Sequence, residues 1–170
     1  IQQLPYLKSR YPTFADYAGK RVPEIFRPEE LEAAEHYQAE QLASIVGWND
    51  GNGSFRIDSL PFRAQLTPVY GILAEDLDGD GARELLLGGN LAAANPQAGP
   101  YDAGYGTLFR LDSARTYREV PSRESGFFSP GEIRSIRLVR SRGHPLVLVA
   151  RNNSHLQVFR AAGPQARPME

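Results

Sequence analysis

The chain has no cysteine, and this absence excludes disulfide bonds, thiolate zinc sites and cysteine nucleophiles. It has no apolar run long enough to cross a bilayer as a helix. Neither sign of charge dominates, because 19 lysines and arginines are balanced by 20 aspartates and glutamates. Bulk charge therefore gives no reason to expect nucleic acid or a membrane surface as the partner.

Signatures of catalysis are scarce as well. The three histidines have no partner at the spacing of a metal site or a catalytic triad. No G-x-S-x-G turn and no glycine-rich phosphate loop after a strand is present. We therefore predict a non-enzymatic protein. A glycosidase needs only two facing carboxylates, which leave no sequence motif, so a carbohydrate-active hydrolase stays open as the alternative.

What is present is an ordinary globular composition. Of 170 residues, 41% are hydrophobic and 23% are charged, which is enough to bury a core in one domain or two small units. The chain starts at Ile1 instead of Met and shows no secretory signal. We expect it to be a piece of a longer protein whose targeting segment lies upstream.

The most informative segment is the acidic run D-L-D-G-D-G-A-R-E, residues 76–84. Four carboxylates this close together repel one another unless a cation lies among them. Oxygen ligands at alternate residues suit Ca²⁺, which takes about six to eight of them. We predict a calcium loop whose ligands are the side chains of Asp76, Asp78, Asp80 and Glu84 and the backbone carbonyl of Ala82.

This loop departs from an EF-hand. Its twelfth position is the apolar Leu87, and its flanks, residues 69–74 and 84–87, predict strands instead of helices. We expect a short calcium turn between two adjacent strands, where Gly79 and Gly81 supply conformations that other residues resist. A plain polar hairpin turn is the alternative. Within a closed shell of protein oxygens, the ion would fasten the fold and take no part in catalysis.

Residues 1–43 predict a helical lead-in segment. A short helix is expected within residues 6–17, and a longer one opens at Pro28 and continues with Leu31, Ala34 and Tyr37 at helical spacing. From Ser44 onward the pattern indicates β-structure. Strands are predicted over residues 44–48 and 55–58, joined by the turn sequence N-D-G-N-G.

The β-rich part contains an internal repeat at an offset of 62 residues. It matches Phe55 with Tyr117, Pro68 with Pro130, Gly81 with Gly143, Asn90 with Asn152 and residues 85–87 with 147–149; after a length difference of 12, residues 108–110 match 158–160. Repeats built of several short strands are typical of propeller blades. We predict a first blade-like repeat at 44–112, a second, degenerate one at 113–163, and a tail at 164–170.

The two copies differ in their chemistry. Leu138, Arg140, Arg142 and Leu146 replace the four acidic side chains in the second copy, so we expect a single metal site. The first copy also carries a long loop, residues 93–105, rich in glycine, proline and asparagine. Exposed aromatic rings beside polar groups often engage sugars and proteins, so Tyr101, Asp102 and Tyr105 form a possible ligand surface. The alternative is that both tyrosines pack back against the blade.

Several segments together are similar to one family. The acidic loop followed by L-L-L-G-G-N resembles an FG-GAP/VCBS-type blade, whose loop has the form D-x-[DN]-x-D-G-x-x-[DE]. Further segments match in order: F-A-D-Y-A at 14–18, P-V-Y-G at 68–71, Y-D-A-G-Y-G at 101–106 and V-A-R-N-N at 149–153. Over nearly its whole length the chain resembles the C-terminal propeller portion of bacterial cartilage-acidic-protein-like proteins of the ASPIC/UnbV type.

This resemblance implies a mainly β fold, a partial β-propeller of about two blade-like repeats with a helical N-terminal segment, completed by upstream blades of the same parent chain. It implies Ca²⁺ at the five ligands named above, where Glu84 stands in place of a commoner aspartate. It also implies an extracytoplasmic location (periplasmic, outer surface or secreted) and adhesion through protein or glycan binding, without catalysis. A purely structural role, in which these blades only complete a larger propeller, stays open.

Overall fold

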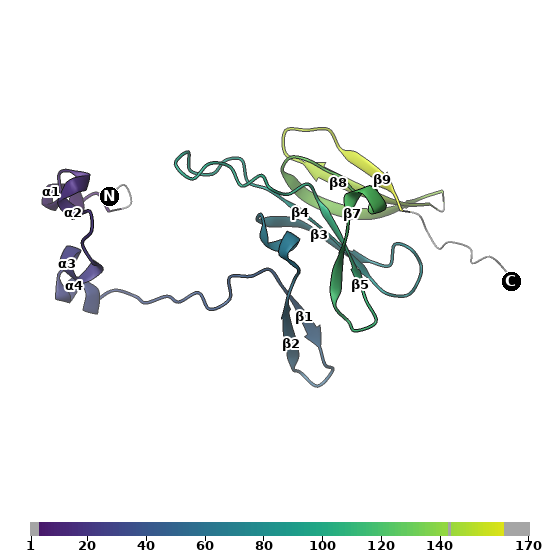
Figure 1. The fold of residues 1–170 in the computed structure, drawn as a ribbon, viewed down its shortest axis with the longest axis horizontal. Helices are drawn as coiled ribbons and strands as arrows, with labels where there is room; N and C mark the ends of the chain where they lie inside the picture. Colours follow the sequence, from purple (N-terminus) through teal and green to yellow (C-terminus); the bar gives the residue numbers. More distant parts are fainter. Residues whose placement is uncertain (1–3, 143, 162–170) are drawn as a thin grey trace. The chain divides into compact units, whose positions relative to one another are not determined.

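The structure, a computed structural model, describes residues 4–142 and 144–161. The chain divides into two compact units, Ile1–Leu42 and Ala43–Glu170. The fold is mainly β and contains three antiparallel sheets, all in the second unit (Figure 1). Among the described residues, no helix has the length and apolar character needed to cross a membrane.

The first unit consists of single helical turns: α1 (Leu7–Arg10), α2 (Phe14–Tyr17), α3 (Val22–Ile25) and α4 (Pro28–Glu32). In α2, α3 and α4 the third residue is acidic, and its carboxylate accepts a hydrogen bond from the backbone N–H of the residue just before the helix. These bonds satisfy donors that a helix start leaves free.

The prediction of a longer helix from Pro28 to Tyr37 is wrong. The helix ends at Glu32, and Tyr37 lies outside any helix with 88% of its surface exposed. The start signals are local and correct, but the residues that follow Leu31 find no apolar surface to pack against. Without such packing, a helix this short is marginal in water.

The second unit is built from strands that pair with their neighbours in the sequence. A hairpin joins β1 (Ile45–Asn49) to β2 (Phe55–Ser59), and the four-stranded sheet contains β3 (Val69–Glu75), β4 (Glu84–Gly89), β5 (Thr107–Leu111) and β6 (Tyr117–Val120). The three-stranded sheet contains β7 (Ile133–Ser141), β8 (His144–Arg151) and β9 (Gln157–Arg160). A short 3-10 helix (Phe62–Gln65) and α5 (Ser122–Ser125) lie in the connections. Within the described residues, no sheet closes on itself.

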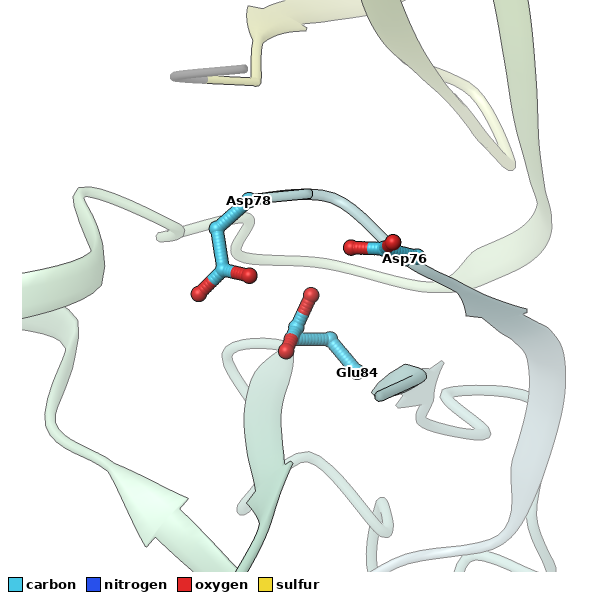
Figure 2. Close-up of side chains that lie close together, drawn as sticks. All are labelled: Asp76, Asp78 and Glu84. Carbon is cyan, nitrogen blue, oxygen red and sulfur yellow. The ribbon is translucent and has the colours of Figure 1, made fainter. Parts of the chain in front are cut away.

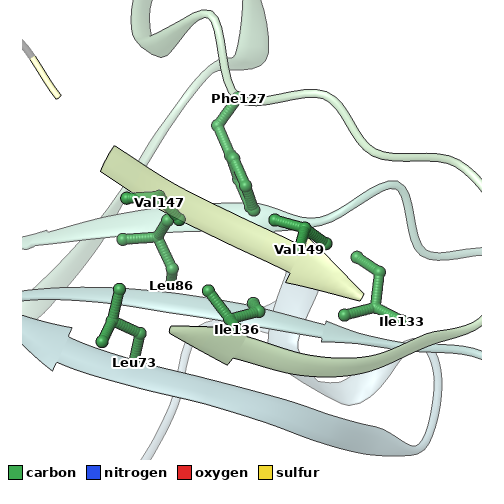
Figure 3. Packing of buried hydrophobic residues seen from close by; sticks show 7 residues of the cluster. All are labelled: Leu73, Leu86, Phe127, Ile133, Ile136, Val147 and Val149. Atoms are coloured by element: carbon green, nitrogen blue, oxygen red, sulfur yellow. The ribbon is translucent and has the colours of Figure 1, made fainter. Parts of the chain in front are cut away.

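Strand β4 is buried on both faces. Leu86 points into a cluster between the four-stranded and three-stranded sheets, and Figure 3 shows this cluster filled by Leu73, Leu86, Phe127, Ile133, Ile136, Val147 and Val149. Leu85 and Leu87 point the other way, into a cluster with Phe109 and Tyr117 that the β1–β2 hairpin covers with Trp48. Burial on both faces explains why β4 is a continuous apolar run without polar alternation.

Close contact between the two larger sheets requires a glycine on β4. A Cβ atom added at Gly88 would lie 2.5 Å from Cδ1 of Ile133, which is itself fully buried. The neighbouring backbone could not shift freely, because Gly88 pairs with Gly71 beside an irregularity in the β3–β4 register. Gly88 therefore sets how closely β7 packs on β4.

A buried asparagine anchors the long loop after β4. Asn90 is 2% exposed and adopts a positive φ of 84°, which asparagine tolerates better than most residues. Its side-chain amide donates to the carbonyls of Gly104 and Gly131 at 2.7 and 3.0 Å, and its Oδ1 accepts from Thr67 and Gly104. Two of these bonds hold the end of the loop at Gly104, one ties Asn90 to the segment before β3, and one ties it to the segment that leads into β7.

Candidate calcium-binding loop

The acidic run forms the loop of the β3–β4 hairpin, as the flanking strand patterns predict. Glu75 and Glu84 pair directly across the two strands and close the loop at its base. Gly79 and Gly81 have φ values of 83° and 91°, in the left-handed region where a side chain is unfavourable. The backbone can therefore curl so that side chains from opposite sides of the loop converge.

Three of the predicted ligands converge. Carboxylate oxygens of Asp76, Asp78 and Glu84 lie within 4.8 Å of one another, and Figure 2 shows the three groups turned toward a shared space. Two unit charges at that separation repel by about 1 kcal/mol in water and by about 3.5 kcal/mol at an effective dielectric constant near 20. Among the residues that the structure describes, this is the one group of three or more acidic or histidine side chains close enough to share an ion.

Glu84 is the most constrained member of the group. It is 1% exposed; its Oε2 accepts the backbone N–H of Leu77 at 2.8 Å, while its Oε1 is buried and has no hydrogen-bond partner among the described residues. Burial raises the pKa of this carboxyl, the charges of Asp78 and Asp80 raise it further, and the Leu77 N–H opposes the shift. A cation at the shared space would satisfy the free oxygen and stabilise the ionised form.

The remaining bonds in the loop run from backbone N–H groups to aspartate oxygens. Asp76 accepts from Gly79 at 2.6 Å and from Gly81 at 3.1 Å, and Asp78 accepts from the N–H of Asp80 at 3.2 Å. These bonds also fit the alternative of a plain polar turn. They leave the buried Oε1 of Glu84 without a hydrogen bond from the described residues, and a bound cation would satisfy it.

Asp80 and Ala82 are placed differently from the three converging ligands. Oδ1 of Asp80 accepts the N–H of Ala82 at 2.7 Å, and the Asp80 carboxylate is outside the group within 4.8 Å. Asp80 is still near enough for its charge to raise the pKa of Glu84. The Asp80 side chain and the Ala82 carbonyl therefore stay predicted ligands, while Asp76, Asp78 and Glu84 form the set that the fold brings together.

One charged residue at the loop, Arg110, was not predicted by any sequence pattern. Arg110, on β5, donates from Nη2 to Oδ2 of Asp78 at 3.0 Å, and its Nε lies 3.8 Å from Oε1 of Glu84. It comes from 26 positions beyond Glu84, and only the pairing of β4 with β5 brings the two together. Such a contact follows from sheet order and could not be found from local spacing.

A cleft of about 920 Å³ opens beside the loop, between the two larger sheets. Its apolar lining comes from Leu86, Leu108, Phe127, Val147 and Phe159, and its polar end from the acidic loop with Arg110. Glu124 is the one carboxylate among its lining residues that lies outside the loop. Among the described residues that line the cleft, no two carboxylates lie outside the acidic loop.

The predicted ligand surface lies on the long loop after β4. Tyr101 is 48% exposed and pairs with Leu91 in an isolated β-bridge, and Asp102 is exposed. Tyr105 stacks on Phe128 with ring centroids 5.4 Å apart, yet each ring stays about half exposed. Tyr105 therefore packs against a neighbour and still presents half of its ring to solvent. Phe128 is part of the same surface, although no sequence pattern predicted it.

Comparison with known proteins gives no match to a family model, a curated protein or a solved structure.

Proposed function

We propose that this chain is a non-enzymatic, calcium-binding portion of a β-propeller from an extracytoplasmic protein, with exposed loops that bind a protein or glycan. The observation that carries the calcium site is the buried Oε1 of Glu84, which has no hydrogen-bond partner among the described residues and lies beside two further carboxylates. Asp76, Asp78 and Glu84 would hold the ion, and Asp80 and the Ala82 carbonyl would complete its oxygen shell. The ion fastens the end of the β3–β4 hairpin.

Strand registers support the proposed pair of blades. Leu85 pairs with Phe109 in one sheet and Val147 pairs with Phe159 in the other, as the repeat offset requires for the second and third strands. The first strands differ, because Val69 is opposite Gly89 while Ile133 is opposite Arg151, an offset of 64 between Val69 and Ile133.

The shifted offset changes how the two hairpins compare. Leu138 lies inside β7 opposite Val147, so it is a strand residue and not the counterpart of the loop residue Asp76. Pairing continues to Ser141 and His144, whereas in the acidic hairpin it stops at Glu75 and Glu84. The second hairpin would lack both the acidic side chains and the length of loop that holds them.

The β1–β2 hairpin and the three-stranded sheet each expose apolar side chains, which supports the proposal that these sheets belong to a larger ring. Trp48 packs inward, so strand alternation turns Ile57 and Phe55 outward, where they are 54% and 60% exposed. On the three-stranded sheet, Val158 pairs with Leu148 on the face away from the core and is 54% exposed. Further blades of the parent chain would cover both faces.

A thermal melt with and without calcium tests the metal site. Wild-type protein should bind Ca²⁺ at pH 7 and melt at a higher temperature with the ion than with EDTA. Asp78→Ala should melt at the same temperature in both conditions, because the loss of one charged ligand weakens the whole shell. The calcium proposal is wrong if EDTA changes neither the metal content nor the melting temperature of the wild type.

A glycan and protein binding screen tests the second half of the proposal. Tyr105→Ala should weaken the binding of any ligand found in the screen. It should leave the calcium-dependent rise in melting temperature unchanged, because Tyr105 is half exposed and lies outside the acidic loop. The exposed apolar faces favour a purely structural role as the second candidate. That role gains support if the chain binds nothing in the screen and self-associates, and if Ile57→Lys abolishes the self-association.

A further inference from the structure

We infer that Arg110 is an exchangeable counter-cation of the acidic loop, which neutralises Asp78 and Glu84 and gives way when Ca²⁺ binds. The inference rests on the proposed calcium site and assigns a role to a residue outside the predicted ligand set. Arg110 thereby sets how tightly the loop holds the metal.

Strand pairing places the guanidinium at the loop. Leu85 is opposite Phe109, so one step further along both strands Glu84 is opposite Arg110. Phe109 points into the cluster beneath the hairpin, and strand alternation therefore turns Arg110 to the other face, the one that carries Leu86 and the cleft. The side chain reaches the carboxylates from this face.

The contacts of Arg110 are those of a replaceable partner. It makes one hydrogen bond to the cluster, to Asp78, and its 3.8 Å separation from Oε1 of Glu84 leaves that oxygen without a bond. About half of its side chain, 51%, is exposed. A planar guanidinium of charge +1 neutralises the three carboxylates incompletely, whereas Ca²⁺ carries twice the charge and approaches oxygens to about 2.3–2.6 Å.

Arg110 and Ca²⁺ compete for the same oxygens, because Asp78 and Glu84 belong to both sets. A released guanidinium has space to move, since Arg110 already lines the cleft beside the loop. Competition lowers the apparent calcium affinity. It also keeps the acidic cluster partly neutralised when calcium is scarce.

Calcium titration of three variants tests this role. Arg110→Gln should bind Ca²⁺ about 3- to 10-fold more tightly than wild type at low ionic strength, the range expected for a partly exposed ion pair and its like-charge repulsion of the metal. Arg110→Lys keeps the charge and should stay near wild type. Arg118→Gln is the matched control, because Arg118 is opposite Arg110 on β6 but pairs with Asp112, and its affinity change should stay within about 2-fold.

A measurement on the unaltered protein gives an independent readout. In an NMR titration the Nε–H resonance of Arg110 should shift with Ca²⁺ and saturate with the metal, while that of Arg118 should not move. If wild type binds no Ca²⁺, the proposed calcium site itself fails. If wild type binds Ca²⁺ but Arg110→Gln binds it equally or less tightly, or the Arg110 resonance does not respond, the calcium site stands and the exchange role of Arg110 is refuted.

Discussion

Glu84→Gln and wild type should exchange places in stability when calcium is replaced by a chelator. Without the ion, wild type carries a buried carboxylate with two aspartates close by, and one of its oxygens has no hydrogen bond from the described residues, only the long contact with Arg110. Glutamine keeps an oxygen for the N–H of Leu77, removes the charge, and turns an amide donor toward Asp78. The variant should therefore be the more stable protein in EDTA and the less stable one in Ca²⁺.

The size of each effect follows from the burial of Glu84. An unsatisfied buried polar oxygen costs about 1–3 kcal/mol, which corresponds to roughly 3–10 °C in melting temperature for a chain of this size. Calcium at 100 times its dissociation constant stabilises wild type by about 2.7 kcal/mol and should leave the variant almost unchanged. Both differences are large enough for a thermal melt.

The pH dependence of stability in chelator is a second test of whether the Glu84 charge destabilises the metal-free protein. The pKa of Glu84 is raised in the folded protein, so the unfolded chain ionises first as pH rises. Stability is then highest below the ordinary glutamate pKa and falls as pH rises from there through the folded value. The fall should be present in wild type and missing in Glu84→Gln, and the difference between the two curves isolates this group from the exposed carboxyls.

Glu75→Gln is the matched control for these melts. Glu75 pairs with Glu84 across the base of the loop but is exposed, so its replacement should change stability by no more than about 0.5 kcal/mol in either condition. The reasoning fails if Glu84→Gln is less stable than wild type in EDTA, or if it retains the calcium-dependent rise in melting temperature.

Three further outcomes are expected. Gly88→Ala should lower the unfolding free energy in urea by about 1–3 kcal/mol with and without Ca²⁺, because the new Cβ would clash with Ile133; an unchanged midpoint would contradict the close packing of the sheets. Asn90→Ala should cost about 2 kcal/mol or more because a buried side chain loses four hydrogen bonds, and a loss below about 0.5 kcal/mol would contradict its anchoring role. In hydrogen exchange, EDTA should speed the amides of Leu77 and Leu85 up to about 100-fold, and the rates of the amides in the middle of β7 and β8 are the control that should not change.

Local patterns in the sequence predicted the acidic hairpin well. Glycines, alternating acids and the apolar run after Glu84 all act within a few residues of one another, and the strands at 69–75 and 84–89 lie where these signals place them. The helix from Pro28 failed for the opposite reason. Its capping signals are local, but its continuation depended on an apolar partner surface that the unit does not supply.

Contacts made through sheet order were beyond the reach of sequence patterns. Arg110 and Phe128 both complete surfaces whose other members were predicted, and each comes from a different strand or connection. Offset matching had the same limit. The 62-residue offset aligns the second and third strands of the two sheets, but the first strands are related by an offset two residues longer. A shift of two residues keeps each apolar side chain on the same face of the strand, so the hydrophobic pattern does not reveal it.

The charge that a cation would compensate comes from one position at the start of a strand. Glu84 begins β4, and the strand carries its side chain into the protein on the same face as Leu86, so burial of the carboxylate is imposed by the strand and not by the loop. At the corresponding place in the other hairpin, Leu146 is opposite Val139 just as Glu84 is opposite Glu75. The half-buried Leu146 carries no charge for a cation to compensate. Under the proposed function, calcium would therefore compensate for a buried charge that the strand itself creates.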